Sequence, residues 1–163
     1  MHSDRAIEIR DLRPADAALA AALHADGFGQ DPWPVSAFSE LLATPGTFGF
    51  LAFEAAAPLG FLLCRAAADE CEILTITVLE AARRRSVGSL LLSHGLNHAA
   101  AIGVRNVFLE VAVDNAAAIS LYRRAGFAQT AVRPAYYRRK NPQQRVDAAV
   151  MALTLEAGPE AKT

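Results

Sequence analysis

The stretch Ala82 to Leu92, ARRRSVGSLLL, places three arginines and a Ser-Val-Gly sequence directly before a strongly apolar segment. The first N–H groups of a helix lack intrahelical acceptors and carry about half a positive charge, so a helix start favours phosphate. Neighbouring guanidinium groups would add charged donors. Two interpretations stay open at this point: an ordinary basic loop before a packed helix, or a site for an anion.

A second candidate is Glu110, which interrupts the apolar stretch Val107 to Ala112. A carboxylate among such neighbours costs free energy unless it is hydrogen-bonded, hydrated or used in chemistry. Glu110 therefore either points outward at a strand edge or accepts a proton in a reaction. Tyr122 follows on a short predicted helix, where tyrosine is usually a packing residue, and Asn115 stands where it would cap that helix.

The chain predicts an alternation of strands and helices that would position these side chains. Strands are expected at 6–10, 47–54, 59–66, 71–79, 107–113, 127–133 and 146–155, helices at 14–25, 35–42, 87–102 and 116–124, and a basic connection at 136–145. Antiparallel strands come first and a strand-helix-strand unit lies in the middle, so the predicted fold class is α/β with a mixed sheet (α+β). We expect one domain over 1–156 and a C-terminal tail over 157–163.

Composition excludes several classes of function. Apolar residues make up 53% and charged residues 20% of the chain, which is typical of a globular protein. The net charge of -1 gives no general field for nucleic acid, so no nucleic-acid partner is expected. The longest apolar run, 48–68, is broken by Glu54, Pro58 and Gly60 and favours a hairpin over a membrane span. No signal peptide is recognised at the amino end.

Cysteine and histidine usage indicates a reducing compartment and no metal. With only Cys64 and Cys71, buried thiols are favoured over a disulfide, and the cytoplasm is the expected location. His94 and His98 are spaced i,i+4 on a predicted helix, but no third ligand is visible. We therefore expect surface or packing roles for both histidines.

The arginine stretch resembles the coenzyme A motif of the GNAT N-acetyltransferases, R/Q-x-x-G-x-G/A, which lies between a strand and a helix. Arg83, Ser86 and Gly88 occupy its three defined positions, with Ser86 in place of the first glycine. A positive φ at Ser86 would cost about 1 to 2 kcal/mol. We therefore expect a negative φ, with the amide still available as a donor.

Residues 108–127, FLEVAVDNAAAISLYRRAGF, are similar to the RimI branch of that family, the ribosomal-protein-alanine N-acetyltransferases. That branch also has a tryptophan loop near its amino end and an R-x-N-Y-Y sequence near its carboxyl end. Here Trp33, Arg133, Tyr136 and Tyr137 match, whereas Ala135 replaces the asparagine. The resemblance spans nearly the whole chain and implies the GNAT fold with acetyl-CoA as cosubstrate.

The resemblance also implies roles for individual residues. Glu110 would accept a proton, and Tyr122 would donate one to the departing thiolate. Backbone groups of Ile76, Thr77 and Val78 would pair with the pantetheine arm, and the walls of the acceptor groove would include Trp33, Tyr136 and Tyr137. Trp33 is equally well explained as a packing residue. The remaining coenzyme A contacts would come from Arg83, Arg84, Arg85, Ser86, Val87, Gly88, Ser89 and Asn115.

The acceptor follows from amine chemistry and from the resemblance together. An α-amine has a pKa near 8 and lysine near 10.4, so at neutral pH far more of the α-amine is neutral and ready to attack. The family match points to the N-terminal amine of a protein that begins with alanine. This amine would attack acetyl-CoA directly in a ternary complex, without an acyl-enzyme. Two alternatives stay open: a GNAT enzyme for a small amine, and a catalytically idle acyl-CoA-binding module. The oligomeric state is not determined by the sequence.

Overall fold

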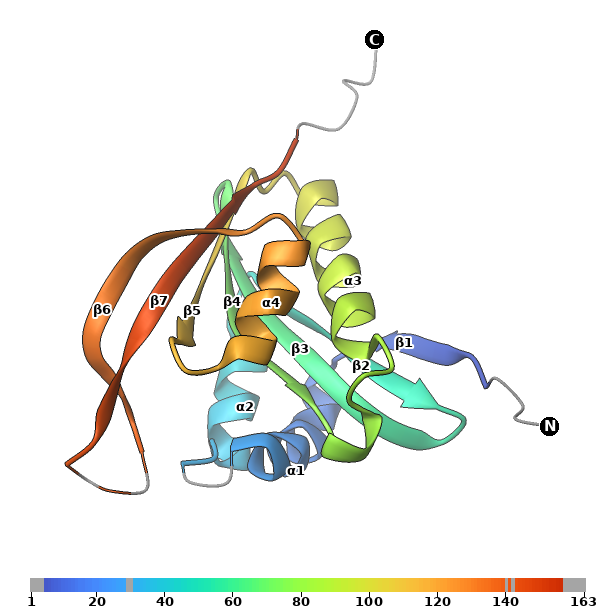
Figure 1. Ribbon diagram of the computed structural model, residues 1–163. Coiled ribbons are helices and arrows are strands. Elements are labelled where there is room, and N and C mark those ends of the chain that lie inside the picture. Colours follow the sequence, from blue (N-terminus) through green and yellow to red (C-terminus); the bar gives the residue numbers. More distant parts are fainter. Residues whose placement is uncertain (1–4, 29–30, 140, 142, 157–163) are drawn as a thin grey trace, which may run out of the picture. The chain divides into compact units, whose positions relative to one another are not determined.

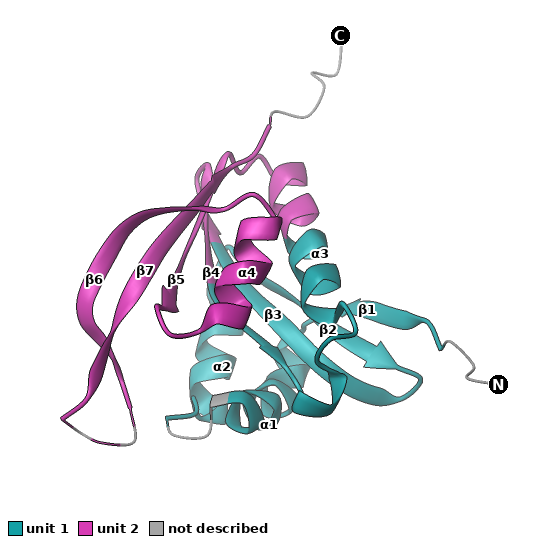
Figure 2. Ribbon diagram, viewed as in Figure 1, with its two compact units in different colours: residues 1–65, 74–95 teal, residues 66–73, 96–163 magenta. Residues whose placement is uncertain are grey.

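The computed structural model describes residues 5–28, 31–139, 141 and 143–156. Two compact units make up the chain: residues 1–65 with 74–95, and residues 66–73 with 96–163 (Figure 2). We call them the first and the second unit. Strand β4 (Glu70–Val78) and helix α3 (Val87–Ala101) each have residues in both units. The single domain predicted over 1–156 stays a prediction, and the predicted tail 157–163 lies outside the described residues.

The strands of the first unit are antiparallel neighbours in the order β1, β2, β3 (Figure 1). They comprise β1 (Ile7–Asp11), β2 (Thr47–Glu54) and β3 (Ala57–Ala67), close to the predicted ranges. Strand β4 follows β3 in the hydrogen-bonded order, and the two backbones approach closely. A Cβ added at Gly60 would lie only 2.3 Å from the carbonyl oxygen of Thr77, so this position requires glycine.

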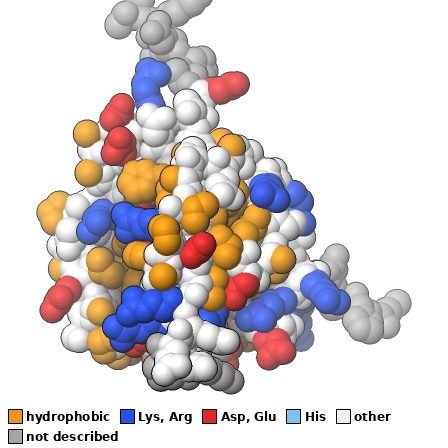
Figure 3. All heavy atoms as spheres, turned by 60° about the vertical axis from the view of Figure 1, so that its left-hand side comes forward, with side chains coloured by type: hydrophobic (Ala, Val, Ile, Leu, Met, Phe, Trp, Pro, Cys, Tyr) orange, Lys and Arg blue, Asp and Glu red, His pale blue; other side chains and the backbone are white. Residues whose placement is uncertain are grey.

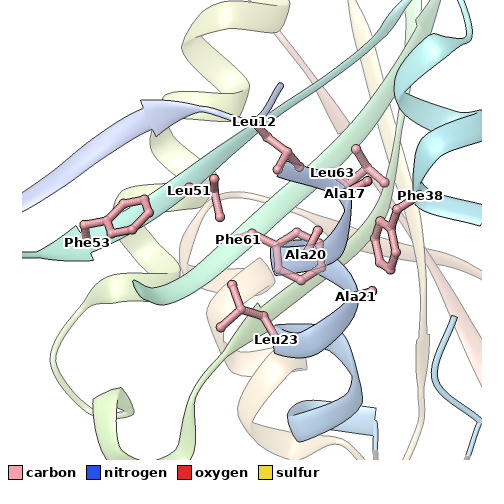
Figure 4. Close-up of a cluster of buried hydrophobic side chains, with 10 residues drawn as sticks. All are labelled: Leu12, Ala17, Ala20, Ala21, Leu23, Phe38, Leu51, Phe53, Phe61 and Leu63. Carbon is pink, nitrogen blue, oxygen red and sulfur yellow. The ribbon is translucent and has the colours of Figure 1, made fainter. Parts of the chain in front are cut away.

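Two helices of the first unit bury its core against the strands. A 3-10 turn, η1 (Pro14–Asp16), leads into α1 (Ala17–Phe28), whose many alanines favour helix, and α2 (Val35–Ala43) follows. The rings of Phe38 and Phe61 meet edge to face at 5.7 Å. Figure 4 shows the buried cluster, which contains Leu12, Ala17, Ala20, Ala21, Leu23, Phe38, Leu51, Phe53, Phe61 and Leu63.

The second unit contains the parallel pairing that defines the fold class. The start of β4 pairs in parallel with β5 (Asn106–Ala112), for example Glu72 with Phe108. On its other side β5 pairs antiparallel with β7 (Arg145–Thr154), and β7 pairs with β6 (Ala128–Arg138). Helix α4 (Ala116–Arg124) has the predicted bounds. The predicted mixed sheet with a parallel strand-helix-strand unit is confirmed, and the described residues contribute seven strands to it.

The predicted basic connection over 136–145 is wrong. Strand β6 continues to Arg138 and β7 begins at Arg145, so Tyr136 and Tyr137 belong to a strand. The register shifts between Arg133 and Tyr137, which is a bulge that extends the pairing past Pro134. Within the bulge Ala135 has a φ of 53°, and its N–H donates to Oδ1 of Asp147 at 2.8 Å. The sequence pattern missed this because a bulge interrupts the alternation of strand residues.

The surface carries both signs of charge. Figure 3 shows acidic and basic side chains interspersed with hydrophobic ones on the face that it displays, in keeping with the net charge of -1. Within residues 5–28, 31–139, 141 and 143–156, none of the helices combines the length and the apolar character needed to cross a membrane.

Candidate active site

The turn before α3 has an unusual backbone. After a 3-10 turn, η2 (Glu80–Ala82), Arg84 and Ser86 both adopt left-handed conformations, with φ of 62° and 61°. The expected negative φ at Ser86 is therefore wrong, and this conformation costs about 1 to 2 kcal/mol for a residue with a Cβ. Both neighbours of Ser86 are held by contacts, since Val87 is 1% exposed and Arg85 forms an ion pair with Glu54.

Two arginine side chains anchor this turn within the first unit. Arg85 forms an ion pair with Glu54 at the end of β2, and Arg83 Nε donates to the carbonyl oxygen of Val78 at 3.4 Å. Arg84 is exposed. The turn thus combines three guanidinium groups with the first N–H groups of a helix that runs for 15 residues. Such a donor set fits a phosphorylated ligand.

The end of β4 presents backbone groups on its edge opposite β3. The Thr77 carbonyl lies against β3, and the Leu79 N–H donates to the Leu59 carbonyl at 2.8 Å. Because backbone groups alternate along a strand, those of Ile76 and Val78 point to the opposite edge. The Thr77 hydroxyl is buried and has no hydrogen-bond partner among the described residues. The free backbone groups of this edge fit the predicted contact with the pantetheine arm, whose amides can pair with them.

Glu110 lies on β5, an interior strand of the second unit. Its neighbours Leu109 and Val111 are buried, whereas the Glu110 side chain is 20% exposed on the other face. At Glu110 the strand pairs with Val150 of β7, whereas its parallel pairing with β4 reaches only Phe108, so the alternative that placed Glu110 at a strand edge stays open. Arg133 Nε lies 3.2 Å from Glu110 Oε1, so the carboxylate is paired with a cation.

Two tyrosines of β6 converge on Glu110. The hydroxyl of Tyr137 donates to the Glu110 backbone oxygen at 3.1 Å, and the Tyr136 side chain hydrogen-bonds the carboxylate. The Glu110 charge, burial and this hydrogen bond raise the pKa of Tyr136, while Arg133 opposes the shift. Burial and the Glu110 charge raise the pKa of Tyr137 to about 12. Both phenols therefore stay protonated and can donate at neutral pH.

The contact between Arg133 and Glu110 was missed as a site feature in the sequence. Arg133 matches the R-x-N-Y-Y pattern, but the sequence alone indicates no catalytic or binding role for it. Its guanidinium also lies over the Tyr136 ring, 5.3 Å from the centroid, and the two tyrosine rings meet edge to face at 5.1 Å. The bulge at Ala135 creates this arrangement, since it changes the register between Arg133 and Tyr137.

Asn115 and Tyr122 lie at the start and near the end of α4. Asn115 Oδ1 accepts from the Ala118 N–H at 3.2 Å, which confirms the predicted cap. Capping uses only the carbonyl oxygen, so the Asn115 amide nitrogen keeps its donors for other contacts. Tyr122 is 5% exposed, and its ring lies 5.8 Å from that of Phe127. Its predicted proton donation stays a prediction.

Trp33 belongs to an aromatic cluster of the first unit. Its ring stacks on His24 at 4.8 Å and lies 5.6 Å from Phe38. The backbone N–H of Trp33 donates to His24 Nδ1 at 3.1 Å, and burial lowers the pKa of His24 to about 4. The neutral imidazole thus holds the start of the segment before α2. This supports the packing interpretation of Trp33, and its contact with an acceptor stays a prediction.

The remaining cysteines and histidines take structural positions. Cys64 and Cys71 are buried thiols and do not form a disulfide. His94 Nδ1 lies 3.2 Å from the Leu90 carbonyl, and its ring meets that of Phe50. His2 lies outside the described residues. Within the described part of the chain, no three His, Cys, Asp or Glu side chains gather as metal ligands.

The mixed sheet and the basic turn before α3 place the chain among α/β proteins with a helix start suited to a phosphorylated ligand. The model of the Acetyltransferase (GNAT) family matches residues 17–127, and the chain belongs to this family. It is 39% identical to the N-alpha-acetyltransferase RimI of Mycobacterium tuberculosis over 137 residues, 81% of this chain and 85% of that protein.

Two further similarities bear on the acceptor. The crystal structure of the ribosomal-protein-S18-alanine N-acetyltransferase from Escherichia coli matches with a TM-score of 0.86 at 26% identity, covering 97% of this chain and 99% of that one. The mycothiol acetyltransferase of Gordonia bronchialis is 43% identical over 93 residues, but these are only 55% of this chain and 30% of that protein.

Proposed function

We propose that this protein transfers the acetyl group of acetyl-CoA to the N-terminal α-amine of another protein. The acceptor begins with alanine and is, for example, a ribosomal protein. The observation that carries the proposal is the Glu110 carboxylate, half-buried on β5 and contacted by Arg133 and Tyr136. The family and the relatives that act on N-terminal amines support it. A cytoplasmic location is part of the proposal and agrees with two buried thiols.

Coenzyme A binding is assigned to the turn before α3 and the end of β4. The first amides of α3 and the arginine side chains would hold the diphosphate, and the backbone groups of Ile76 and Val78 would pair with the pantetheine arm. Asn115 would add its amide nitrogen. The residues proposed to hold the diphosphate are Arg83, Arg84, Arg85, Ser86, Val87, Gly88 and Ser89.

When bound, acetyl-CoA supplies the acetyl group as a thioester. Glu110 accepts the proton that the acceptor ammonium must lose before its nitrogen forms the new C–N bond. Tyr122 gives its phenolic proton to the sulfur as the C–S bond breaks, because a thiol is a better leaving group than a thiolate at neutral pH. Tyr136 and Tyr137, both protonated, position Glu110 and line the acceptor side.

A small-molecule amine is the second candidate acceptor. The similarity to a mycothiol acetyltransferase supports it, although that similarity covers a smaller part of both chains than the similarity to the N-alpha-acetyltransferase. Among protein amines, the N-terminal α-amine suits a modest base such as Glu110 better than a lysine side chain does. Deprotonating the lysine ammonium at neutral pH costs about 3 kcal/mol more.

Intact-mass analysis tests the proposal. The protein is incubated with acetyl-CoA and peptides that begin with alanine, including the N-terminal peptide of ribosomal protein S18, and in parallel with small amines. We expect a single acetyl group on the α-amine of the peptide. Turnover of small amines with every peptide unmodified would replace the first function by the second. Acetyl-CoA binding without turnover of either would leave an acyl-CoA-binding module.

A further inference from the structure

Arg133 is held beside Glu110 by the register of three strands of the second unit. Glu110 of β5 pairs with Val150 of β7, and Arg133 of β6 pairs with Ala148 of β7. Because side chains alternate along a strand, residues two apart on β7 share a face, and so do their partners on either side. The strands β5, β7 and β6 follow one another in the sheet (Figure 1). Arg133 therefore reaches Glu110 across the intervening strand.

The Arg133 guanidinium touches a carboxylate and an aromatic ring at the same time. Its Nε lies 3.2 Å from Glu110 Oε1, and its Cζ lies 5.3 Å from the centroid of the Tyr136 ring. The Arg133 side chain is 56% exposed, against 20% for Glu110. Arg133 is thus the partner that can move without disturbing buried atoms, and the face of the Tyr136 ring can keep its charge nearby while it moves.

An acceptor amine reaches the Glu110 carboxylate only by exchange with this guanidinium. At neutral pH about nine-tenths of an α-amine is ammonium, which is a donor to the same carboxylate oxygens. Glu110 keeps a charged partner in the exchange, because the ammonium replaces the guanidinium, whereas Arg133 loses its own. An acceptor that offers Arg133 a hydrogen-bond acceptor in return should therefore bind better than one that offers none.

The first carbonyl group of a peptide is suited to this exchange. Its oxygen lies about 3 Å from the α-nitrogen, since only Cα and the carbonyl carbon separate the two atoms. An α-ammonium bound to Glu110 brings this oxygen within reach of a guanidinium whose Nε lies 3.2 Å from the same carboxylate. A guanidinium has only donors, and a carbonyl oxygen only accepts. A simple amine displaces Arg133 and offers no such oxygen.

We propose that Arg133 selects acceptors with a carbonyl group next to the amine, by moving from Glu110 to the first carbonyl oxygen when the ammonium binds. The inference rests on the proposed function, because it assumes that Glu110 receives the amine. It adds the chemical feature by which this site would distinguish a peptide N-terminus from an amine without a neighbouring carbonyl.

Kinetics with two matched peptides test the inference. One begins with alanine, and the other is the same peptide with its first amide bond replaced by a trans alkene, which removes the carbonyl oxygen and keeps the extended shape. Arg133→Gln should raise KM for the normal peptide about tenfold with little change in kcat, as expected for a contact made equally before and during the reaction. KM for the alkene peptide should not rise. Comparing each variant with the wild-type protein on the same peptide cancels differences in amine pKa.

Two further variants sharpen the comparison. Arg133→Lys should keep part of the preference for the normal peptide, because lysine still donates but lacks the planar fork of arginine. The matched control is Arg138→Gln, which removes an exposed guanidinium from the same strand. Arg138 pairs with Arg145, three residues from Ala148 on β7, so it lies on the other face and its loss should leave both KM values unchanged. Calorimetry should show unchanged acetyl-CoA affinity in all three variants.

Equal changes in KM for the two peptides in Arg133→Gln would overturn the inference, because Arg133 would then act on the site as a whole. A fall in kcat with an unchanged KM would also overturn it and would make Arg133 a positioning residue for Glu110. Both results leave the proposed function standing, since the wild-type protein would still acetylate the normal peptide. Failure of the wild-type protein to acetylate that peptide would instead overturn the proposed function, and the inference with it.

Discussion

The Arg133 guanidinium lies 3.2 Å from the Glu110 carboxylate, so the proposed proton acceptor is paired with a cation before any amine arrives. An acceptor ammonium would approach the same carboxylate and would compete with Arg133 for it. Arg133 is more than half exposed, which leaves its side chain room to turn aside into solvent. The Glu110 carboxylate has a charged hydrogen-bond donor in either arrangement, from Arg133 or from the ammonium.

Glu110→Gln should lower kcat by about 10² to 10⁴-fold, the usual contribution of a general base. The substitution keeps the size of the side chain and its ability to accept hydrogen bonds, so acetyl-CoA affinity should change little. Steady-state kinetics and calorimetry on the same preparation measure the two effects. Glu70→Gln, which removes an exposed carboxylate at the start of β4, is the matched control. Equal turnover in Glu110→Gln and the wild-type protein would eliminate Glu110 as the base.

Tyr122→Phe should reduce turnover at least tenfold while the protein keeps its fold. The ring contact with Phe127 survives the substitution, and only the phenolic hydroxyl, with the proton that it would donate, is lost. Urea unfolding should show a loss of no more than about 1 kcal/mol, the usual worth of one hydrogen bond. If turnover is unchanged, Tyr122 is a packing residue, as its burial alone would indicate.

Elements with a clear periodic pattern could be predicted from the sequence, whereas backbone irregularities could not. The bounds of β2 and α4 agree with expectation because a continuous apolar run next to turn residues and a capping asparagine are local signals. The conformations of Ser86 and Ala135 depend on distant contacts, with Glu54 reaching Arg85 and Asp147 reaching the Ala135 N–H. No local propensity predicts a left-handed serine or alanine.

The same limit applies to the candidate site. Glu110 was recognisable because a carboxylate in an apolar strand is unusual. Its partner Arg133 was not, because the contact depends on the strand order that places β7 between β5 and β6 and on the bulge in β6. This contact arises from the fold and leaves no pattern in the sequence.

Ser86→Gly should stabilise the protein by up to about 1.6 kcal/mol. Relief of the left-handed serine returns about 1 to 2 kcal/mol, and the greater freedom of glycine in the unfolded chain removes about 0.4 to 1. Ala135→Gly should behave alike, because Ala135 has a φ of 53°. The control is Ser93→Gly in the middle of α3, which should cost about 0.5 kcal/mol. Urea midpoints of the three variants decide the matter, and destabilisation by Ser86→Gly would contradict the strain.

Stability should fall as the pH is lowered, through His24. Burial lowers its pKa from 6.5 to about 4, so the folded state disfavours the protonated imidazole. The stabilising contribution of the neutral imidazole is fully present above pH 6.5 and is lost as the pH falls. By pH 4 the free energy of unfolding should have decreased by about 3 kcal/mol. Urea unfolding between pH 7.5 and pH 4, as a function of pH, measures this slope.

His24→Asn separates this effect from the titration of carboxylates. Asparagine keeps an acceptor near the Nδ1 position for the Trp33 N–H, but it does not titrate. We expect lower stability at pH 7.5, because ring contacts with Trp33 and Phe38 are lost, together with a flatter dependence between pH 6.5 and 4. Identical slopes in the variant and the wild-type protein would assign the acid sensitivity to other groups. A flatter slope would identify the His24 imidazole as the group that must stay neutral for Trp33 to pack.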